Sequence, residues 1–145
     1  MWQNQAILSA AELVLNGDLG ELKRLAAETA RFCRENSLGE DVELDLNLAL
    51  EELFANAVKH GGCQGMNDAV EIRIGLRSDG VQVEYADRGR PFDPGLAPPP
   101  DLSVPLRDRQ PGGFGVHLIR QVMQNIEYRR AGEWNRITML RRVTP

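Results

Sequence analysis

The chain has 145 residues, of which 42% are hydrophobic and 26% are charged. This size and balance are typical of one globular domain that buries its own core, so we expect a single domain over residues 1–145. No apolar run approaches the eighteen residues of a membrane span, and the formal net charge of −4 argues against nucleic acid as a partner.

The first residues and the two cysteines indicate the compartment. The N-terminal residues lack the basic stretch and the long apolar run of a secretory signal. Cys33 and Cys63 fall in helix-like and turn-like contexts, without the spacing of metal ligands. We therefore expect reduced thiols in a cytoplasmic protein.

The first half of the chain predicts one strand and two helices. Residues 11–16 alternate like a strand. Asp18 and Glu21 form a capping-box pattern, which predicts the start of a helix that reaches about residue 36. A second helix is predicted over residues 41–59, with a core stripe of Leu46, Leu50, Leu53 and Ala57.

The second half predicts two hairpins with a loop and a helix between them. The loop is proline-rich and includes an expected lid over residues 93–111; a short amphipathic helix follows over residues 116–123. The paired strand-like runs are residues 70–76 with 81–85, and residues 126–130 with 134–142. This order predicts an α+β two-layer sandwich, a mixed, mostly antiparallel sheet with helices on one face.

Three motifs carry candidate chemistry. Glu52, Asn56 and His60 are four residues apart, so they form one stripe on the second helix, either a site for a hard cation and a reacting hydroxyl or an ordinary solvated face. Asp87 and Gly89 follow a strand and suit either a ligand amine or a plain turn. The third motif consists of glycines that lead into a helix, which suits either a phosphate cradle or a hinge.

The three motifs, in this order, resemble those of the GHKL (Bergerat-fold) ATPases and kinases. Within that group the chain is similar to the small bacterial anti-sigma-factor serine/threonine kinases. The resemblance extends from about residue 15 to residue 142, and the matching segments are residues 51–61 (EELFANAVKHG), 87–94 (DRGRPFDP) and 112–119 (GGFGVHLI).

The resemblance implies a role for each matched residue. Glu52 is expected to be the general base on an attacking hydroxyl, and Asn56 to ligate a Mg²⁺ that bridges the phosphates of ATP. Asp87 is expected to accept a hydrogen bond from the adenine amino group. The other expected contacts are Gly89 at the adenine, Thr138 near Asp87, Gly113 and Gly115 at the phosphates, and Lys59 and His60 beside them. For His60, a structural role at the end of its own helix is an equal alternative.

The resemblance also implies a function. The chain is expected to phosphorylate a serine or threonine on an anti-sigma-factor antagonist and to sequester a sigma factor or similar target, as a homodimer. It departs from the family pattern at Pro111, where several such kinases have Arg, and at Gln124, where Asp is frequent. These departures motivate an alternative function, a nucleotide-gated protein-binding module without kinase activity. A histidine kinase or a gyrase-like ATPase is less expected, because no phosphoacceptor helix pair or transducer domain accompanies the motifs.

Overall fold

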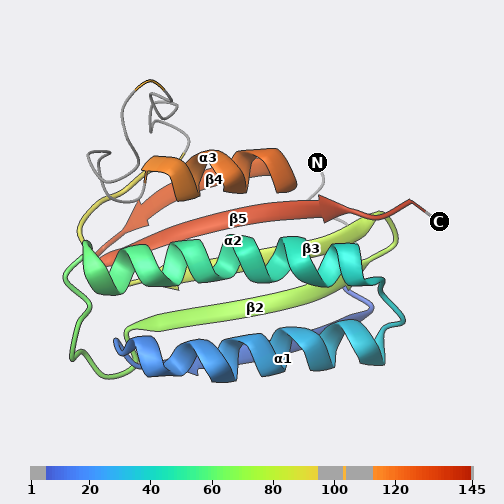
Figure 1. Cartoon of the computed structure of the whole chain (residues 1–145), viewed down its shortest axis with the longest axis horizontal. Helices are drawn as coiled ribbons and strands as arrows, with labels where there is room; N and C mark the ends of the chain where they lie inside the picture. Colours follow the sequence, from blue (N-terminus) through green and yellow to red (C-terminus); the bar gives the residue numbers. More distant parts are fainter. Residues whose placement is uncertain (1–5, 95–102, 104–112, 145) are drawn as a thin grey trace.

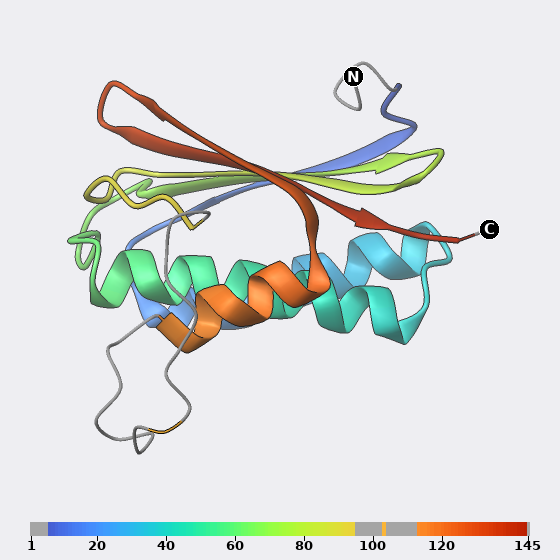
Figure 2. The ribbon, with the colours of Figure 1, turned by 90° about the horizontal axis from the view of Figure 1, so that it is seen from above.

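In the part of the chain that the structure describes, five strands form one sheet, and three α-helices cover one of its faces (Figures 1 and 2). The computed structural model describes residues 6–94, 103 and 113–144. The predicted lid over residues 93–111 therefore lies mostly outside the described residues. The strands are β1 (Ser9–Leu15), β2 (Val70–Arg77), β3 (Gly80–Asp87), β4 (Gln124–Ala131) and β5 (Trp134–Arg142). The α-helices are α1 (Leu22–Glu35), α2 (Glu40–Lys59) and α3 (Gly113–Val122).

The sheet has the strand order β1-β2-β3-β5-β4, and every neighbouring pair in it is antiparallel. The expected mixed sheet is thus antiparallel throughout the described chain. Both predicted hairpins are confirmed, since β2 pairs with β3 and β4 pairs with β5. Because β5 inserts between β3 and β4, the residues that follow β3 lie beside those that open β5, with Asp87 opposite Asn135.

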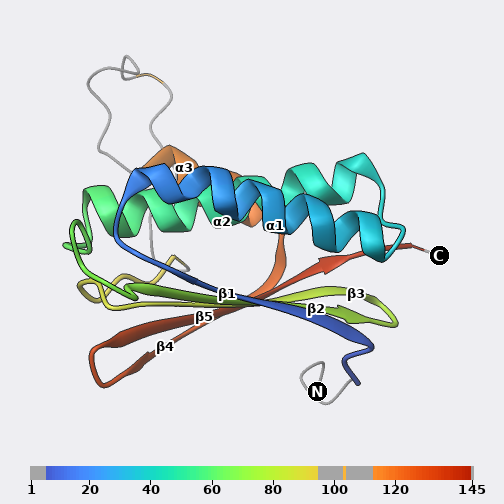
Figure 3. The ribbon, with the colours of Figure 1, turned by 90° about the horizontal axis from the view of Figure 1, so that it is seen from below.

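The core lies between the sheet and the helices. The predicted stripe of α2 is confirmed, since Leu46, Leu50, Leu53 and Ala57 are all buried. Figure 3 shows α1 and α2 along the same face of the sheet, and no helix of the described residues lies on the opposite face. No helix of the described residues combines the length and apolarity required to cross a membrane.

The capping box at the start of the first helix differs from the prediction. Asp18 caps a short 3₁₀ turn (Leu19–Glu21) by accepting a hydrogen bond from Gly20 N at 2.9 Å, and α1 begins only at Leu22. The Glu21 carboxylate accepts from Asn16 N at 3.0 Å, instead of from the cap residue. The intervening turn moves Glu21 back toward the end of β1, so the carboxylate ties the helix to the strand.

The end of β1 also anchors the loop that follows α2. Gly17 N donates to Met66 O and Gly65 N donates to Gly17 O, each at 2.8 Å. A Cβ at Gly17 would lie 1.6 Å from the carbonyl oxygen of Cys63, so the two backbones approach more closely than any side chain allows. This contact fixes residues 61–66, which border the site described below.

We expect Gly17→Ala to destabilise the fold by about 1–3 kcal/mol or more, because the new methyl group overlaps the backbone of Cys63. The free energy of unfolding from urea titration measures the effect. Gly20→Ala is the matched control, since its Cβ would meet nothing closer than the Asp18 carboxylate at 3.4 Å. Equal stabilities of the two variants would contradict the close approach.

Candidate functional site

The first two motifs meet at one end of the molecule. Arg90 N donates to Gly61 O at 2.9 Å, which joins the loop after β3 to the turn that ends α2. Figure 1 shows the C-terminal end of α2, the loop after β3 and the start of α3 at this same end. Segments far apart in sequence therefore border one site.

Glu52 and Asn56 lie one turn apart on α2, and both are partly buried. Neither side chain forms a hydrogen bond or an ion pair with another described residue. In contrast, the neighbouring Glu51 accepts from Asn47 Nδ2 at 3.1 Å. The lack of described partners for Glu52 and Asn56 agrees both with a ligand site and with an ordinary solvated face.

Asp87 is the best-connected group of the site and is only 7% exposed. Its Oδ1 accepts hydrogen bonds from Gly89 N and from Asn135 Nδ2, both at 2.8 Å. Its Oδ2 accepts from the Tyr85 hydroxyl at 2.9 Å. Three donors therefore hold a buried carboxylate in one orientation at the end of β3.

Asn135 was not predicted as a site residue, yet it organises the loop after β3. Besides Asp87, its Nδ2 donates to Arg90 O at 2.7 Å, and its Oδ1 accepts from Phe92 N at 3.2 Å. The Tyr128 hydroxyl also donates to Oδ1, at 2.7 Å. Only the pairing register places this residue opposite Asp87, so no sequence motif marks it.

Burial and the charge of Asp87 shape the ionisation of its neighbours. Burial first, and then the Asp87 charge and hydrogen bond, raise the pKa of the Tyr85 hydroxyl well above its ordinary value. Burial and the same charge raise the pKa of the Cys63 thiol to about 11, although a backbone hydrogen bond from Arg88 opposes the shift. Both groups are therefore protonated at neutral pH. Cys33 and Cys63 are buried and free, which confirms the predicted thiols.

Gly89 has a structural reason for lacking a side chain. A Cβ there would lie 3.0 Å from Asp87 Oδ1 and 3.1 Å from Gly61 O. The glycine thus permits the loop after β3 to pack on the turn after α2. This close backbone packing is a structural role of Gly89, in addition to the expected role of letting a ligand approach.

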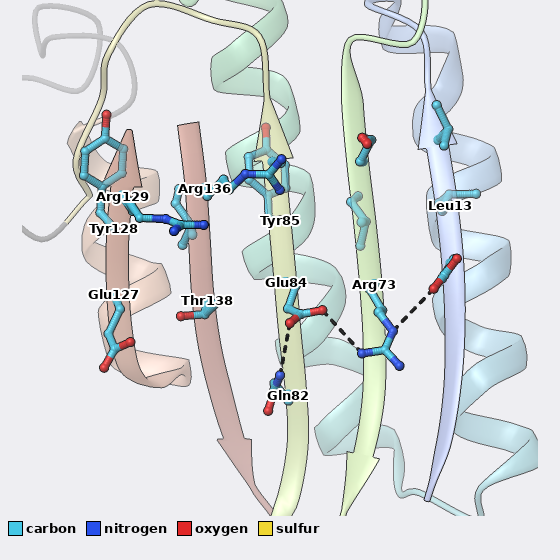
Figure 4. Close-up of a pocket in the computed structure, with 16 residues that line it drawn as sticks. Leu13, Arg73, Gln82, Glu84, Tyr85, Glu127, Tyr128, Arg129, Arg136 and Thr138 are labelled. Carbon is cyan, nitrogen blue, oxygen red and sulfur yellow. Dashed lines mark hydrogen bonds and ion pairs between the residues drawn. The ribbon is translucent and has the colours of Figure 1, made fainter. Parts of the chain in front are cut away.

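Thr138 is not brought to Asp87. It pairs with Glu84 on β3, three residues from Asn135, and successive residues of a strand point to opposite faces. Figure 4 shows Thr138 on the helix-free face, where it lines a hollow of about 1090 Å³ together with Glu84, Glu127 and Arg136. Asn135 occupies the place beside Asp87 that Thr138 was expected to fill.

The remaining predicted residues lie around the same end. Lys59 is the last residue of α2 and His60 its C-cap, and both are exposed. Gly113 and Gly115 lie inside the first turn of α3, which begins at Gly113, earlier than the predicted residue 116. Pro111 lies outside the described residues. The glycines therefore belong to the helix N-terminus itself, where unpaired backbone N–H groups favour anions.

The donor set at this end suits a hard cation. Among the described residues, no three His, Cys, Asp or Glu side chains gather into a metal cage. A Mg²⁺ that is shared with phosphates needs only one or two protein oxygens, with the rest from phosphate and water. The side-chain oxygens of Asn56 and Glu52, which have no hydrogen bond or ion pair with another described residue, fit that requirement.

We expect Asn135→Ala to lower the free energy of unfolding by about 1–3 kcal/mol, because it leaves the buried Asp87 carboxylate and two partly buried backbone groups without the partner that Asn135 provides. Urea titration measures the change. Thr138→Ala, on the same strand but the opposite face, is the control and should cost less. A larger effect at Thr138 would show that the loop does not depend on Asn135.

Relatives with assigned activities are similar to this chain in sequence. The chain is 33% identical over 100 residues to the serine/threonine-protein kinase BtrW of Bordetella bronchiseptica, which covers 69% of this chain and 70% of BtrW. It is 30% identical over 87 residues to the serine-protein kinase RsbW of Oceanobacillus iheyensis, which covers 57% of this chain and 55% of that protein.

The fold has a counterpart among solved structures. The crystal structure of the RsbU and RsbW domains of a Mycobacterium tuberculosis protein superposes with a TM-score of 0.68, at 15% identity, over 94% of this chain and 33% of that one. At this identity the likeness concerns the fold alone. The family model for the histidine kinase-like ATPase domain matches residues 15–141, and the chain therefore belongs to that family.

Proposed function

We propose that this chain is an ATP-dependent protein serine/threonine kinase that acts as an anti-sigma-factor-type regulator in a partner switch. The observation that carries the proposal is that the site contains two carboxylates whose burial and hydrogen bonding differ. Asp87 is buried and held by three donors, whereas Glu52 lies partly exposed on α2 without a partner among the described residues. One is suited to bind, and the other to accept a proton.

The adenine end of the proposed site is Asp87. An ionised carboxylate only accepts hydrogen bonds, so it selects a ligand that offers an N–H, such as the adenine amino group. The donors to Asp87 come from β3, from the loop after it and from β5. The acceptor is therefore in place before any ligand arrives, which lowers the cost of binding.

The phosphate end lies along α2 and at the N-terminus of α3. Gly113 and Gly115 would offer backbone N–H groups to the phosphates, with Lys59 and His60 at the rim. Asn56 would hold Mg²⁺, which neutralises charge on the phosphates when it is bound. Glu52 would take the proton of the substrate hydroxyl as that oxygen bonds to the γ-phosphorus and the bond from this phosphorus to ADP breaks.

The names of the relatives support the choice of substrate class. BtrW and RsbW are protein kinases of serine, or of serine and threonine. We therefore propose an anti-sigma-factor antagonist as the phosphorylated partner, a sigma factor or similar target as the sequestered one, and a homodimer in the cytoplasm as the working form. The alternative, a nucleotide-gated binding module without kinase activity, is motivated by the departures at Pro111 and Gln124. Pro111 lies outside the described residues, and Gln124 Oε1 accepts a hydrogen bond from Arg142 N at 3.0 Å.

Binding of adenine nucleotides to the wild type should depend on Asp87. With Mg²⁺ and ATP or ADP at a hundred times the dissociation constant, we expect stabilisation by about 2.7 kcal/mol in thermal unfolding, but not with GTP. Asp87→Asn should lose most of this effect for ATP and ADP alike. The asparagine amide contains a donor as well as an acceptor, so it no longer selects a ligand that donates. Glu84→Gln, on the other face of the same strand, is the control. Unchanged stabilisation in Asp87→Asn would remove the adenine assignment.

Phosphoryl transfer should depend on Glu52. With a cognate antagonist domain and ATP, we expect Glu52→Ala to slow phosphoserine formation by about 10²–10⁴-fold while ATP affinity changes little, because only the proton acceptor is lost. Glu51→Ala is the control. It removes the neighbouring carboxylate, which already accepts a hydrogen bond from Asn47, and the rate of phosphoserine formation should stay at the wild-type value. Mass spectrometry of the antagonist measures both rates. If even the wild type binds ATP and the partner but never transfers phosphate, the binding-module alternative holds.

A further inference from the structure

Tyr85 lies fully inside the protein, between the expected adenine acceptor and the helix that carries Glu52. Its hydroxyl oxygen is 2.9 Å from Asp87 Oδ2 and 3.1 Å from the carbonyl oxygen of Leu53 on α2. A phenol has one proton, and both neighbours are acceptors. The nearer, charged carboxylate takes the larger share of it.

The hydrogen bonds of Asp87 leave little freedom for a ligand. A carboxylate has about four acceptor positions, two on each oxygen. Oδ1 is filled by Gly89 N and Asn135 Nδ2, and Oδ2 already accepts from Tyr85. With respect to the described residues, one acceptor position is left, on Oδ2, and the Tyr85 hydroxyl determines which one it is.

We propose that Tyr85 is a specificity-determining residue that acts through Asp87, by keeping this carboxylate an acceptor with a single free position that takes a 6-amino purine and rejects a 6-oxo purine. The inference rests on the proposed ATP site and deepens it. A carboxylate accepts hydrogen bonds and has none to donate to a 6-oxo group. Loss of the phenol hydroxyl removes one of three donors and releases Oδ2.

The ionisation of Tyr85 agrees with this role. Burial and the adjacent carboxylate raise the pKa of its hydroxyl well above the ordinary value, so the group stays protonated and remains a donor. Phenylalanine fills the same space in the core without the hydroxyl. The aromatic packing of Tyr85 and its hydrogen bond can therefore be separated by one substitution.

The test compares the dissociation constants of ATP and inosine triphosphate, with Mg²⁺, for the full chain and for Tyr85→Phe. In the wild type, ATP should bind more tightly than inosine triphosphate. In Tyr85→Phe the ratio of the two constants should fall by about tenfold, the factor expected for one hydrogen bond to a charged group. A purely structural role would weaken both nucleotides by the same factor and leave the ratio unchanged, which would overturn the proposal.

Tyr128→Phe is the matched control. It removes a phenol hydroxyl that contacts Asn135 and not Asp87, so the ratio should stay at the wild-type value. An equal fall of the ratio in both variants would overturn a specific role of Tyr85. If the wild type itself binds no ATP, the proposed function fails and this inference fails with it. If the wild type prefers ATP and Tyr85→Phe keeps that preference, only this inference fails.

A second measurement does not depend on how well Tyr85→Phe folds. The chain has two tyrosines, Tyr85 and Tyr128, so ¹³Cζ-labelled tyrosine gives two NMR signals, which Tyr128→Phe assigns. Saturating ADP should shift the Tyr85 signal, because its proton is redistributed between Asp87 and Leu53 O when an amine also donates to Asp87. Saturating inosine diphosphate should leave that signal closer to its ligand-free position. Identical shifts with both nucleotides would contradict the proposal.

Discussion

The hydrogen bond between Asn135 Nδ2 and Asp87 Oδ1 is the contact on which the site depends. A buried carboxylate is costly unless donors surround it, and Asp87 obtains them from β5, from its own strand and from the loop that follows. The same amide also holds the loop through Arg90 O and Phe92 N. The position of the acceptor and the path of the loop are therefore set by one side chain on a neighbouring strand.

Helix α2, which carries Glu52 and Asn56, is held against β5 near its start and against the loop after β3 at its end. Near its start, Asp45 accepts from Arg141 Nε of β5 at 2.8 Å. Beyond its last turn, Gly61 O accepts from Arg90 N of the loop after β3. The glycines at positions 61 and 89 let these backbones meet, since a Cβ at Gly89 would lie 3.1 Å from Gly61 O. The separation between Asp87 and Glu52 is thus fixed by the scaffold.

The two carboxylates of the site are prepared for different tasks by their surroundings. Asp87 is enclosed by donors, and its neighbours Tyr85 and Cys63 have raised pKa values that keep them uncharged. Glu52 has no partner among the described residues. The proposed function therefore assigns nucleotide binding and proton transfer to separate groups, which suits a kinase in which positioning and electrostatics supply most of the catalysis.

Most elements and all three motifs can be predicted from the sequence, because periodicity and turn residues are local signals. Both hairpins and the core stripe of α2 are confirmed, and Glu52, Asn56 and Asp87 were predicted as candidate residues. The position of Asn135 beside Asp87, the outward side chain of Thr138 and the link from Tyr85 to α2 depend on how the strands pair. In an antiparallel pair the register decides which residues meet, and a strand's alternation decides on which face they meet. The register depends on both strands of a pair, so no single segment of the chain specifies it.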